Sequence, residues 1–260
     1  MVVTTQAHHA LVTGAARGIG LMVARRLLQQ GCRVTITGRN VQALEQAAQQ
    51  LEPLGEVGFV AGDVGSAESV AAAFAKAREQ FGPVDILVNN AGQAVSERFD
   101  RMTEQAWHSM LSVNLTGTFH CIQAALPDML AQKWGRIVNV ASTAGLQGYA
   151  YVSAYCAAKH GVVGLTRSLA LEVAKKGITV NAVCPGYTET DLVRDALDNI
   201  MKKTGMTLDE ARAKLAESNP QGRLVQPEEV ADAVAWLCQP GAGAVNGQSI
   251  PVDGGEVMVG

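Results

Sequence analysis

The chain has 260 residues, a length that suits one α/β domain or two small ones, and 48% of its residues are hydrophobic, enough for a large core. Its formal net charge of -3 argues against nucleic-acid binding, which requires a basic surface. No apolar run approaches the roughly 18 residues that span a bilayer. Residues 1–9 lack the basic and apolar regions of a signal peptide.

The cysteines are five in number, scattered, and without a C-x-x-C pair. We therefore expect neither a disulfide framework nor a zinc site, and a reducing cytoplasm is the simplest location. The pair His8-His9 is expected to be a solvated chain start and not a metal site. The cysteines are Cys32, Cys121, Cys156, Cys184 and Cys238.

Strand-like apolar runs alternate with helical patterns along the chain. The expected strands are 9–13, 33–37, 57–61, 84–88, 136–140, 178–183 and 248–252. The expected helices are 19–30, 41–51, 66–81, 103–130, 154–175 and 227–237, with a possible bend at Pro127. Because parallel strands need crossover connections, this alternation predicts one domain over 1–260, a parallel sheet with helices on both faces.

One irregular stretch, residues 187–222, departs from this alternation. It has patterns for two short helices, 191–201 and 207–218. An insertion after the carboxyl edge of a sheet is well placed to cover a ligand, so we expect a substrate lid there.

A glycine-rich turn joins the first strand to the first helix. Its three glycines, Gly14, Gly18 and Gly20, allow a tight turn and a close approach to a pyrophosphate. The helix start adds free N–H groups and a favourable dipole. We therefore expect a dinucleotide to bind at this turn, with Ile19 among the contacts.

The end of the second strand distinguishes NADP from NAD. NAD sites place an acid there, whereas this chain has Thr37-Gly38-Arg39. Arg39, helped by Arg17 in the glycine turn, could bind a 2′-phosphate through its planar guanidinium. We therefore expect NADP(H), with NAD(H) possible. Asp63-Val64 could contact the adenine, although Asp63 is also a common helix-entry residue.

Tyr155 and Lys159 lie at i and i+4 of one expected helix, and hence on one face. A free tyrosine has a pKa of about 10, too high for acid/base chemistry near neutrality. A nearby ammonium favours the phenolate and lowers that value. The pair is therefore a candidate general acid/base.

The motifs occur in a distinctive order. They are the glycine turn, Asn89-Asn-Ala-Gly92, Asn114, Ser142, Tyr155-x-x-x-Lys159 and Pro185-Gly186. Together they resemble the short-chain dehydrogenase/reductase family, from about residue 10 to 255. The resemblance implies a Rossmann-type doubly wound sheet of seven parallel strands in the order 3-2-1-4-5-6-7.

The resemblance also implies roles. Tyr155 exchanges a proton with the substrate oxygen, Ser142 hydrogen-bonds the same oxygen, and Lys159 lowers the pKa of the tyrosine and binds the nicotinamide ribose. Asn114 fixes a water that links Lys159 to solvent. The remaining cofactor contacts implied by the family are Asn90, Ala91, Gly92, Pro185, Gly186 and Thr188.

Within the family, the chain looks most similar to 3-oxoacyl-thioester reductases and aromatic polyketide ketoreductases. Similar 3-hydroxybutyrate dehydrogenases bind a free carboxylate, often with a His and a Lys at the positions of Ala144 and Val152, so a free acid is not favoured as the small-molecule substrate. A thioester, larger ketone or ring fits better. The candidate substrate contacts are Gln93, Ser142, Ala144, Leu146, Gln147, Tyr149, Tyr155 and Tyr187.

Two alternatives remain open. One is an NAD-dependent alcohol or 3-hydroxyacyl dehydrogenase. The other is a catalytically silent nucleotide-binding protein, a kind that usually lacks the tyrosine or the lysine. The helical stretches 103–130 and 154–175 are richer in apolar and small residues than one buried face requires. In the family such helices pair between subunits, so a homotetramer is expected.

Overall fold

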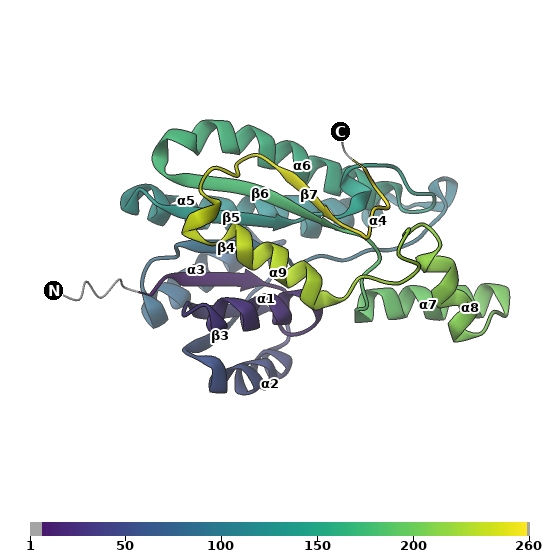
Figure 1. Cartoon of the computed structure of the whole chain (residues 1–260), viewed down its shortest axis with the longest axis horizontal. Coiled ribbons are helices and arrows are strands. Elements are labelled where there is room, and N and C mark those ends of the chain that lie inside the picture. The colour runs from purple at the N-terminus through teal and green to yellow at the C-terminus, as the bar shows by residue number, and fades with distance from the viewer. Residues whose placement is uncertain (1–6, 259–260) are drawn as a thin grey trace.

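The structure, a computed structural model, describes residues 7–258 (Figure 1). Its strands are β1 His9–Thr13, β2 Arg33–Gly38, β3 Val57–Ala61, β4 Ile86–Asn89, β5 Gly135–Val140, β6 Ile178–Pro185 and β7 Ser249–Val252. Its α-helices are α1 Gly18–Gln29, α2 Val41–Leu51, α3 Ala67–Phe81, α4 Glu104–Leu111, α5 Gly117–Gln132, α6 Ser153–Val173, α7 Asp191–Thr204, α8 Leu208–Ala216 and α9 Pro227–Leu237.

The strands form one seven-stranded sheet in the order β3-β2-β1-β4-β5-β6-β7. Every pairing is parallel, and in the centre Leu11 lies opposite Thr35 on one side and Leu87 on the other. The expected fold and strand order are therefore confirmed. The order reverses between β1 and β4, the point at which open α/β sheets bind ligands.

Alternate residues of each strand enter different cores, because successive side chains point to opposite faces of a sheet. Ala10 and Val12 of β1 pack in the cluster that includes residues of α1, α2 and α9. Leu11, between them, packs in the cluster of α3, α5 and α6. Helices cover both faces of the sheet (Figure 1), and this rigid frame fixes where the loops at the strand ends lie.

The expected long helix over 103–130 is interrupted, but not at the expected place. Pro127 lies inside α5 without ending it. The α-helical pattern changes instead at a π-helical turn, Ser112–Thr116, between α4 and α5. Such turns contain an extra residue and often occur at functional sites. This turn carries Asn114.

The expectation of a solvated start at His8-His9 is wrong. The side chain of His9 is fully buried in β1, where its ring nitrogens contact the Gly82 carbonyl at 2.8 Å and Thr35 Oγ1 at 2.9 Å. His8 stacks on Trp134, with ring centroids 3.9 Å apart. Of the segment in which no signal peptide is expected, residues 1–6 lie outside the described part of the chain.

The segment expected to be a lid projects from the carboxyl end of the sheet as α7 and α8 (Figure 1). A parallel bridge between Thr188 and Val225 closes its base. The two helices share a small apolar cluster of Val193, Leu197, Ala211, Ala216 and Leu224. In the described part of the chain, no helix is both long and apolar enough to cross a membrane.

Candidate active site

The loops that carry the predicted motifs follow β1, β4, β5 and β6, and so meet at the carboxyl edge of the sheet. The glycine turn follows β1, and Asn90–Gly92 follows β4. Ser142 comes just after β5, and Gly186 just after β6. The topology therefore brings the motifs to one edge, as a ligand site in this kind of sheet requires.

The glycine turn leaves no room for side chains at Gly14 and Gly20. Gly14 and Gly18 have φ values of 64° and 56°, in the left-handed region that favours glycine. A Cβ atom on Gly20 would lie 2.5 Å from Asn90 Nδ2 and 2.6 Å from the Gly14 carbonyl oxygen. These glycines therefore allow the turn to pack closely against the loop after β4. A side chain at Gly14 or Gly20 would push the two apart.

Asn90 and Ala91 hold the turn in shape. The amide of Asn90 donates hydrogen bonds to the carbonyl oxygens of Thr13 and Gly14, both at 3.0 Å. The hydroxyl oxygen of Thr13 accepts the backbone N–H groups of Asn90 at 3.0 Å and Ala91 at 2.9 Å. The side chain of Asn90 thus fixes the turn, a role the sequence motif did not specify.

The start of α1 is open to an anion. At Asn40, Ser66 and Thr103, the side chain of the N-cap residue accepts a backbone N–H of the helix that follows, whereas Arg17 at the start of α1 caps nothing. The first turn of α1 contains no acid. Its leading N–H groups and its dipole can therefore bind a phosphate.

The two arginines expected at a 2′-phosphate differ in their surroundings. Arg39 is exposed just after β2 and forms no ion pair within residues 7–258. Arg17 donates to Asp191 Oδ2 on α7 at 3.1 Å, which links the lid to the glycine turn. Of the two arginines, Arg39 is therefore the one whose guanidinium is not already held by an ion pair within residues 7–258.

Asp63 behaves as a helix-entry residue. Its Oδ1 accepts the backbone N–H of Gly65 at 3.0 Å, and its own N–H donates to Ser69 Oγ at 2.9 Å. The carbonyl of Val64 contacts the ring of His120 at 3.1 Å. These contacts support the structural interpretation of Asp63, and its contact with an adenine stays a prediction.

Tyr155 and Lys159 come from one face of α6. The ammonium of Lys159 is buried, donates to the Val140 carbonyl at 2.8 Å, and lies 5.6 Å from the centre of the Tyr155 ring. Ser142 lies near enough to the Tyr155 hydroxyl to lower its pKa. The oxygen of Ser142 also accepts the N–H of Ala144 at 3.1 Å. Two hydroxyl groups and one ammonium are thus assembled together.

The protonation states differ from the sequence expectation. Burial raises the pKa of Tyr155 to about 12, while the nearby Ser142 side chain opposes that rise. Burial lowers the pKa of Lys159 to about 8. The ammonium of Lys159 is turned toward the Val140 carbonyl, and burial is the largest influence on the pKa of the Tyr155 hydroxyl. Tyr155 therefore holds its proton at neutral pH, the form that donates a proton in a reduction.

Asn114 is buried in the π-helical turn beside this centre. Its amide donates to the carbonyls of Gln93 at 2.9 Å and Met110 at 3.0 Å, and its oxygen accepts the N–H of Gln93 at 3.2 Å. A Cβ atom on Gly92 would lie 2.9 Å from Asn114 Oδ1 and 3.8 Å from Lys159 Nζ. Gly92 thus lies between these two polar groups. The water assigned to Asn114 by resemblance stays a prediction.

The residues expected along the nicotinamide side lie at the end of β6. Pro185 ends the strand, and the N–H of Gly186 donates to the Val252 carbonyl at 3.1 Å. Thr188 is buried and its hydroxyl donates to the Gly186 carbonyl at 2.9 Å. Their contacts with a cofactor stay predictions.

The expected substrate residues separate into two groups. Gln147 donates to the Tyr149 hydroxyl at 2.8 Å, and the rings of Tyr149 and Tyr187 meet edge to face with centroids 6.3 Å apart. In contrast, Gln93 directs its amide to Ser109 Oγ at 2.8 Å, and Ala144 is buried. The structure adds Glu256, which accepts the Tyr149 hydroxyl at 2.6 Å. No local motif marks Glu256, because its partner is 107 residues away.

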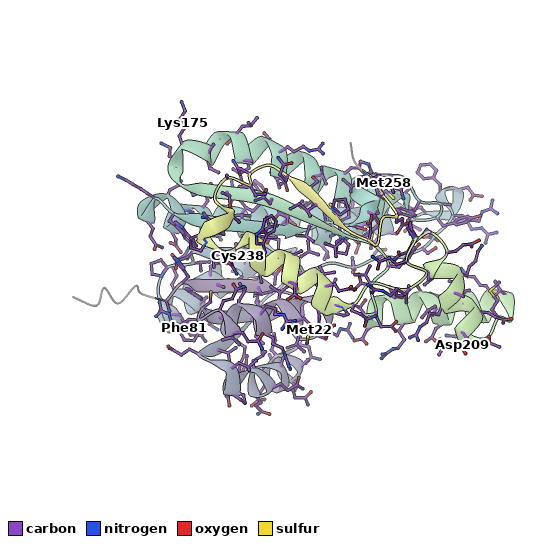
Figure 2. The ribbon with its side chains drawn as sticks, viewed as in Figure 1. Met22, Phe81, Lys175, Asp209, Cys238 and Met258 are labelled. Atoms are coloured by element: carbon purple, nitrogen blue, oxygen red, sulfur yellow. The ribbon has the colours of Figure 1, made fainter. Side chains whose placement is uncertain are left out.

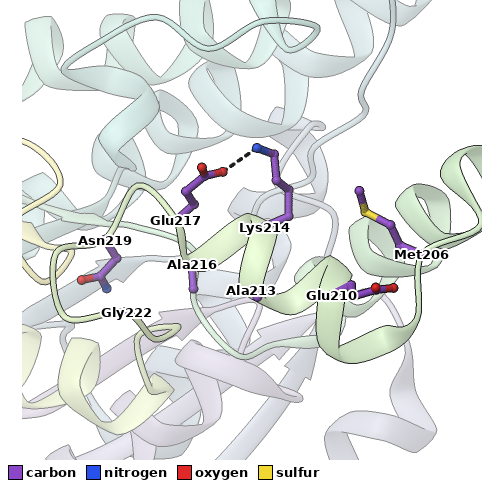
Figure 3. A pocket seen from close by; sticks show the side chains of 8 residues that line it. All are labelled: Met206, Glu210, Ala213, Lys214, Ala216, Glu217, Asn219 and Gly222. Carbon is purple, nitrogen blue, oxygen red and sulfur yellow. Dashed lines mark hydrogen bonds and ion pairs between the residues drawn. The ribbon is translucent and has the colours of Figure 1, made fainter.

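A separate hollow of about 440 Å³ lies on the lid (Figure 3). It is lined by Met206, Glu210, Ala213, Lys214, Ala216, Glu217, Asn219 and Gly222. None of the four predicted catalytic residues lines it, so it is not the site of the chemistry. Within residues 7–258, no group of three His, Cys, Asp or Glu side chains is placed to hold a metal ion, and the five cysteines are free thiols.

Comparison with solved structures gives a full-length match. A tryptophan variant of actinorhodin polyketide ketoreductase, solved with NADPH, superposes with a TM-score of 0.94 at 41% identity. The match covers 97% of this chain and 98% of that one. The likeness therefore includes the sheet, the loops at its carboxyl edge and the lid.

Curated relatives also match over nearly their whole lengths. A putative ketoacyl reductase of Streptomyces coelicolor is 42% identical, covering 97% of this chain and 98% of that protein. A 3-oxoacyl-(acyl-carrier-protein) reductase of Vibrio cholerae is 41% identical over 96% and 97%. D-beta-hydroxybutyrate dehydrogenase of Cupriavidus necator is 38% identical over 95% and 97%. The family model described as short chain dehydrogenase matches residues 8–200. The chain therefore belongs to the short-chain dehydrogenase/reductase family of oxidoreductases.

Proposed function

We propose that the chain reduces a neutral ketone, of the 3-oxoacyl-thioester or a related type, to a secondary alcohol with NADPH. The observation that carries the proposal is the assembly of Tyr155, Ser142 and Lys159 beside Gly92, at the edge where the glycine turn lies. The relatives named as ketoacyl reductases support the reaction class.

The residues divide the chemistry as follows. Ser142 lies near enough to Tyr155 to lower the pKa of its hydroxyl, so both hydroxyl groups are placed to reach one carbonyl oxygen. Tyr155 then donates its proton to that oxygen as the carbonyl carbon is reduced. The phenolate that remains is stabilised by the Lys159 ammonium and the Ser142 hydroxyl. NADPH, when bound, would supply the hydride.

The cofactor assignment rests on the fit of the residues present. The glycine turn and the uncapped start of α1 would hold the diphosphate, since no side chain fills that space. Arg39 would bind the 2′-phosphate, because its guanidinium is exposed and lacks an ion pair within residues 7–258. The structural relative was solved with NADPH, which supports the same choice.

We also propose a homotetramer built on α5 and α6. Phe119 and Leu130 of α5 are 42% and 41% exposed, and Leu171 of α6 is 83% exposed. Large apolar side chains that remain exposed on neighbouring helices favour burial against another subunit. Sedimentation analysis of the wild type and of Leu171→Glu tests this assembly: a tetramer that dissociates in the variant supports it, and a wild-type monomer contradicts it.

The function is tested by measuring NADPH consumption with 3-oxoacyl thioesters, cyclic ketones and aryl ketones, and repeating each assay with NADH. Reduction of at least one class with NADPH preferred supports the proposal. A clear preference for NADH in alcohol oxidation would support the alternative of a catabolic dehydrogenase. Tight NADPH binding without turnover of any ketone would support a silent nucleotide-binding protein.

A further inference from the structure

The C-terminal segment returns to the substrate end of the molecule. Met258 lies at the same end as Asp209 of the lid and opposite Lys175 (Figure 2). A tight turn precedes it, with φ values of 70° at Gly254 and 94° at Gly255. Both carboxylate oxygens of Asp253 accept backbone N–H groups here, from Gly255 at 2.9 Å and Val257 at 2.8 Å. This turn fixes the position of Glu256.

The carboxylate of Glu256 faces the aromatic side chains of the substrate side. Its Oε1 accepts the Tyr149 hydroxyl at 2.6 Å, and its Oε2 lies 3.1 Å from the position that a Cβ on Gly186 would take. Burial first, and Glu256 in addition, raise the pKa of both Tyr149 and Tyr187. The Glu256 carboxylate therefore influences both of these tyrosines, which are expected to contact substrate.

This charge is close to the predicted chemistry. Tyr187, which faces Tyr149 edge to face, contributes to the raised pKa of Tyr155. Tyr187 is thus in contact with the ring of Tyr149, which binds the carboxylate, and it also influences the phenol of Tyr155. Glu256 is partly buried, and it forms no ion pair with Lys, Arg or His in the described part of the chain.

A partly buried carboxylate without a counter-ion repels a second anion and attracts O–H and N–H donors. We propose that Glu256, positioned by the 253–255 turn and by Tyr149, selects the substrate: it disfavours ketones that carry a carboxylate and accepts neutral ketones, above all those with a donor group near the carbonyl. The proposal rests on the proposed function and names its substrate class.

The test compares two substrates that differ mainly in charge, acetoacetate and ethyl acetoacetate. Glu256→Gln removes the charge and keeps an oxygen that can accept the Tyr149 hydroxyl. We expect it to raise kcat/KM for acetoacetate relative to the ester by roughly tenfold, the size of a charge repulsion across a partly screened site. Glu79→Gln, an exposed acid on α3, is the matched control and should leave the ratio unchanged.

A binding experiment gives an independent result. Calorimetry with NADPH-loaded enzyme compares 3-hydroxybutyrate with its methyl ester, so that no turnover occurs. Glu256→Gln should strengthen binding of the anion by a similar factor and leave binding of the ester within about twofold.

The outcomes separate this inference from the proposed function. A folded Glu256→Gln protein with unchanged ratios in both experiments overturns the role of Glu256. If the wild type reduces no ketone with NADPH, the proposed function fails, and the calorimetric ratio alone then decides the inference. A wild type that prefers acetoacetate to its ester also overturns it.

Discussion

The predicted cofactor side and the proposed substrate side of this molecule are built in different ways. On the predicted cofactor side, the groups are mainly backbone atoms of loops that follow adjacent strands, such as the turn at Gly14 and its partner Asn90. On the proposed substrate side they are side chains from separate segments, Tyr149, Tyr187 and Glu256, which meet outside the sheet. The first arrangement is fixed by glycine and sheet register, whereas the second depends on how three surface segments pack.

The largest effect is expected where the backbone contact is closest. Gly20→Ala places a methyl group 2.6 Å from the Gly14 carbonyl oxygen, so the turn must open. Since overpacking of this kind costs about 1–3 kcal/mol, NADPH affinity should fall by up to roughly 100-fold in a fluorescence titration. Gly241→Ala, where the added Cβ meets no atom within 4 Å, is the control. Unchanged affinity in Gly20→Ala would show that the cofactor does not use this turn.

A smaller effect should separate the two cofactors. Arg39→Ala removes a charge-assisted hydrogen bond to the 2′-phosphate, worth about 1.5–3 kcal/mol, so KM for NADPH should rise at least tenfold. KM for NADH, which lacks that phosphate, should stay within about twofold of the wild-type value. An equal loss for both cofactors would place Arg39 in a structural role.

The ion pair between Asp191 of the lid and Arg17 of the glycine turn should have a still smaller effect on NADPH affinity. Asp191→Asn breaks the exposed pair with Arg17 and frees that guanidinium. Exposed ion pairs contribute about 0–1 kcal/mol, so KM for NADPH should fall by no more than about fivefold. The same variant in an Arg17→Ala background should have no further effect. A loss of affinity in Asp191→Asn would instead mean that the ion pair helps to form the site.

The smallest effect concerns the pH dependence of stability and involves His9, which is remote from both sides of the site. Burial lowers the pKa of His9 below 6.5, so the folded protein binds fewer protons than the unfolded chain. Stability should therefore be fully retained above pH 6.5 and decrease as pH falls from there through the folded-state pKa. Thermal unfolding at pH 8 and 5.5 checks this direction, with the exposed His108→Gln protein showing the same dependence. A melting temperature that rises on acidification would contradict the buried, neutral His9.

The difference between the two sides also explains what the sequence could predict. The strands, the sheet order and the glycine turn depend on periodicity and on residues with special backbone geometry, and these can be identified from a local pattern. The helix break at Ser112–Thr116 could not be placed, because Pro127 is the more obvious breaker, whereas a π-helical turn has no simple sequence signature.

The proposed catalytic residues could be selected by their order along the chain, but their protonation could not be predicted. The sequence places Lys159 one turn from Tyr155, yet it does not reveal that the ammonium turns to the Val140 carbonyl and that burial controls both pKa values. Likewise, the sequence suggests that His9 belongs to a polar chain start, whereas in the structure its ring contacts Gly82 and Thr35. Burial and long-range partners are properties of packing, which a linear pattern does not contain.

The central claim is that the protonated phenol of Tyr155 carries the chemistry at an otherwise intact cofactor site. The most direct measurement is the rate of NADPH consumption by Tyr155→Phe with a ketone that the wild type reduces, together with a titration of NADPH binding. We predict a loss of turnover of roughly 100- to 10,000-fold, with NADPH affinity nearly unchanged. Turnover close to the wild-type rate, with NADPH bound equally well, would contradict the account.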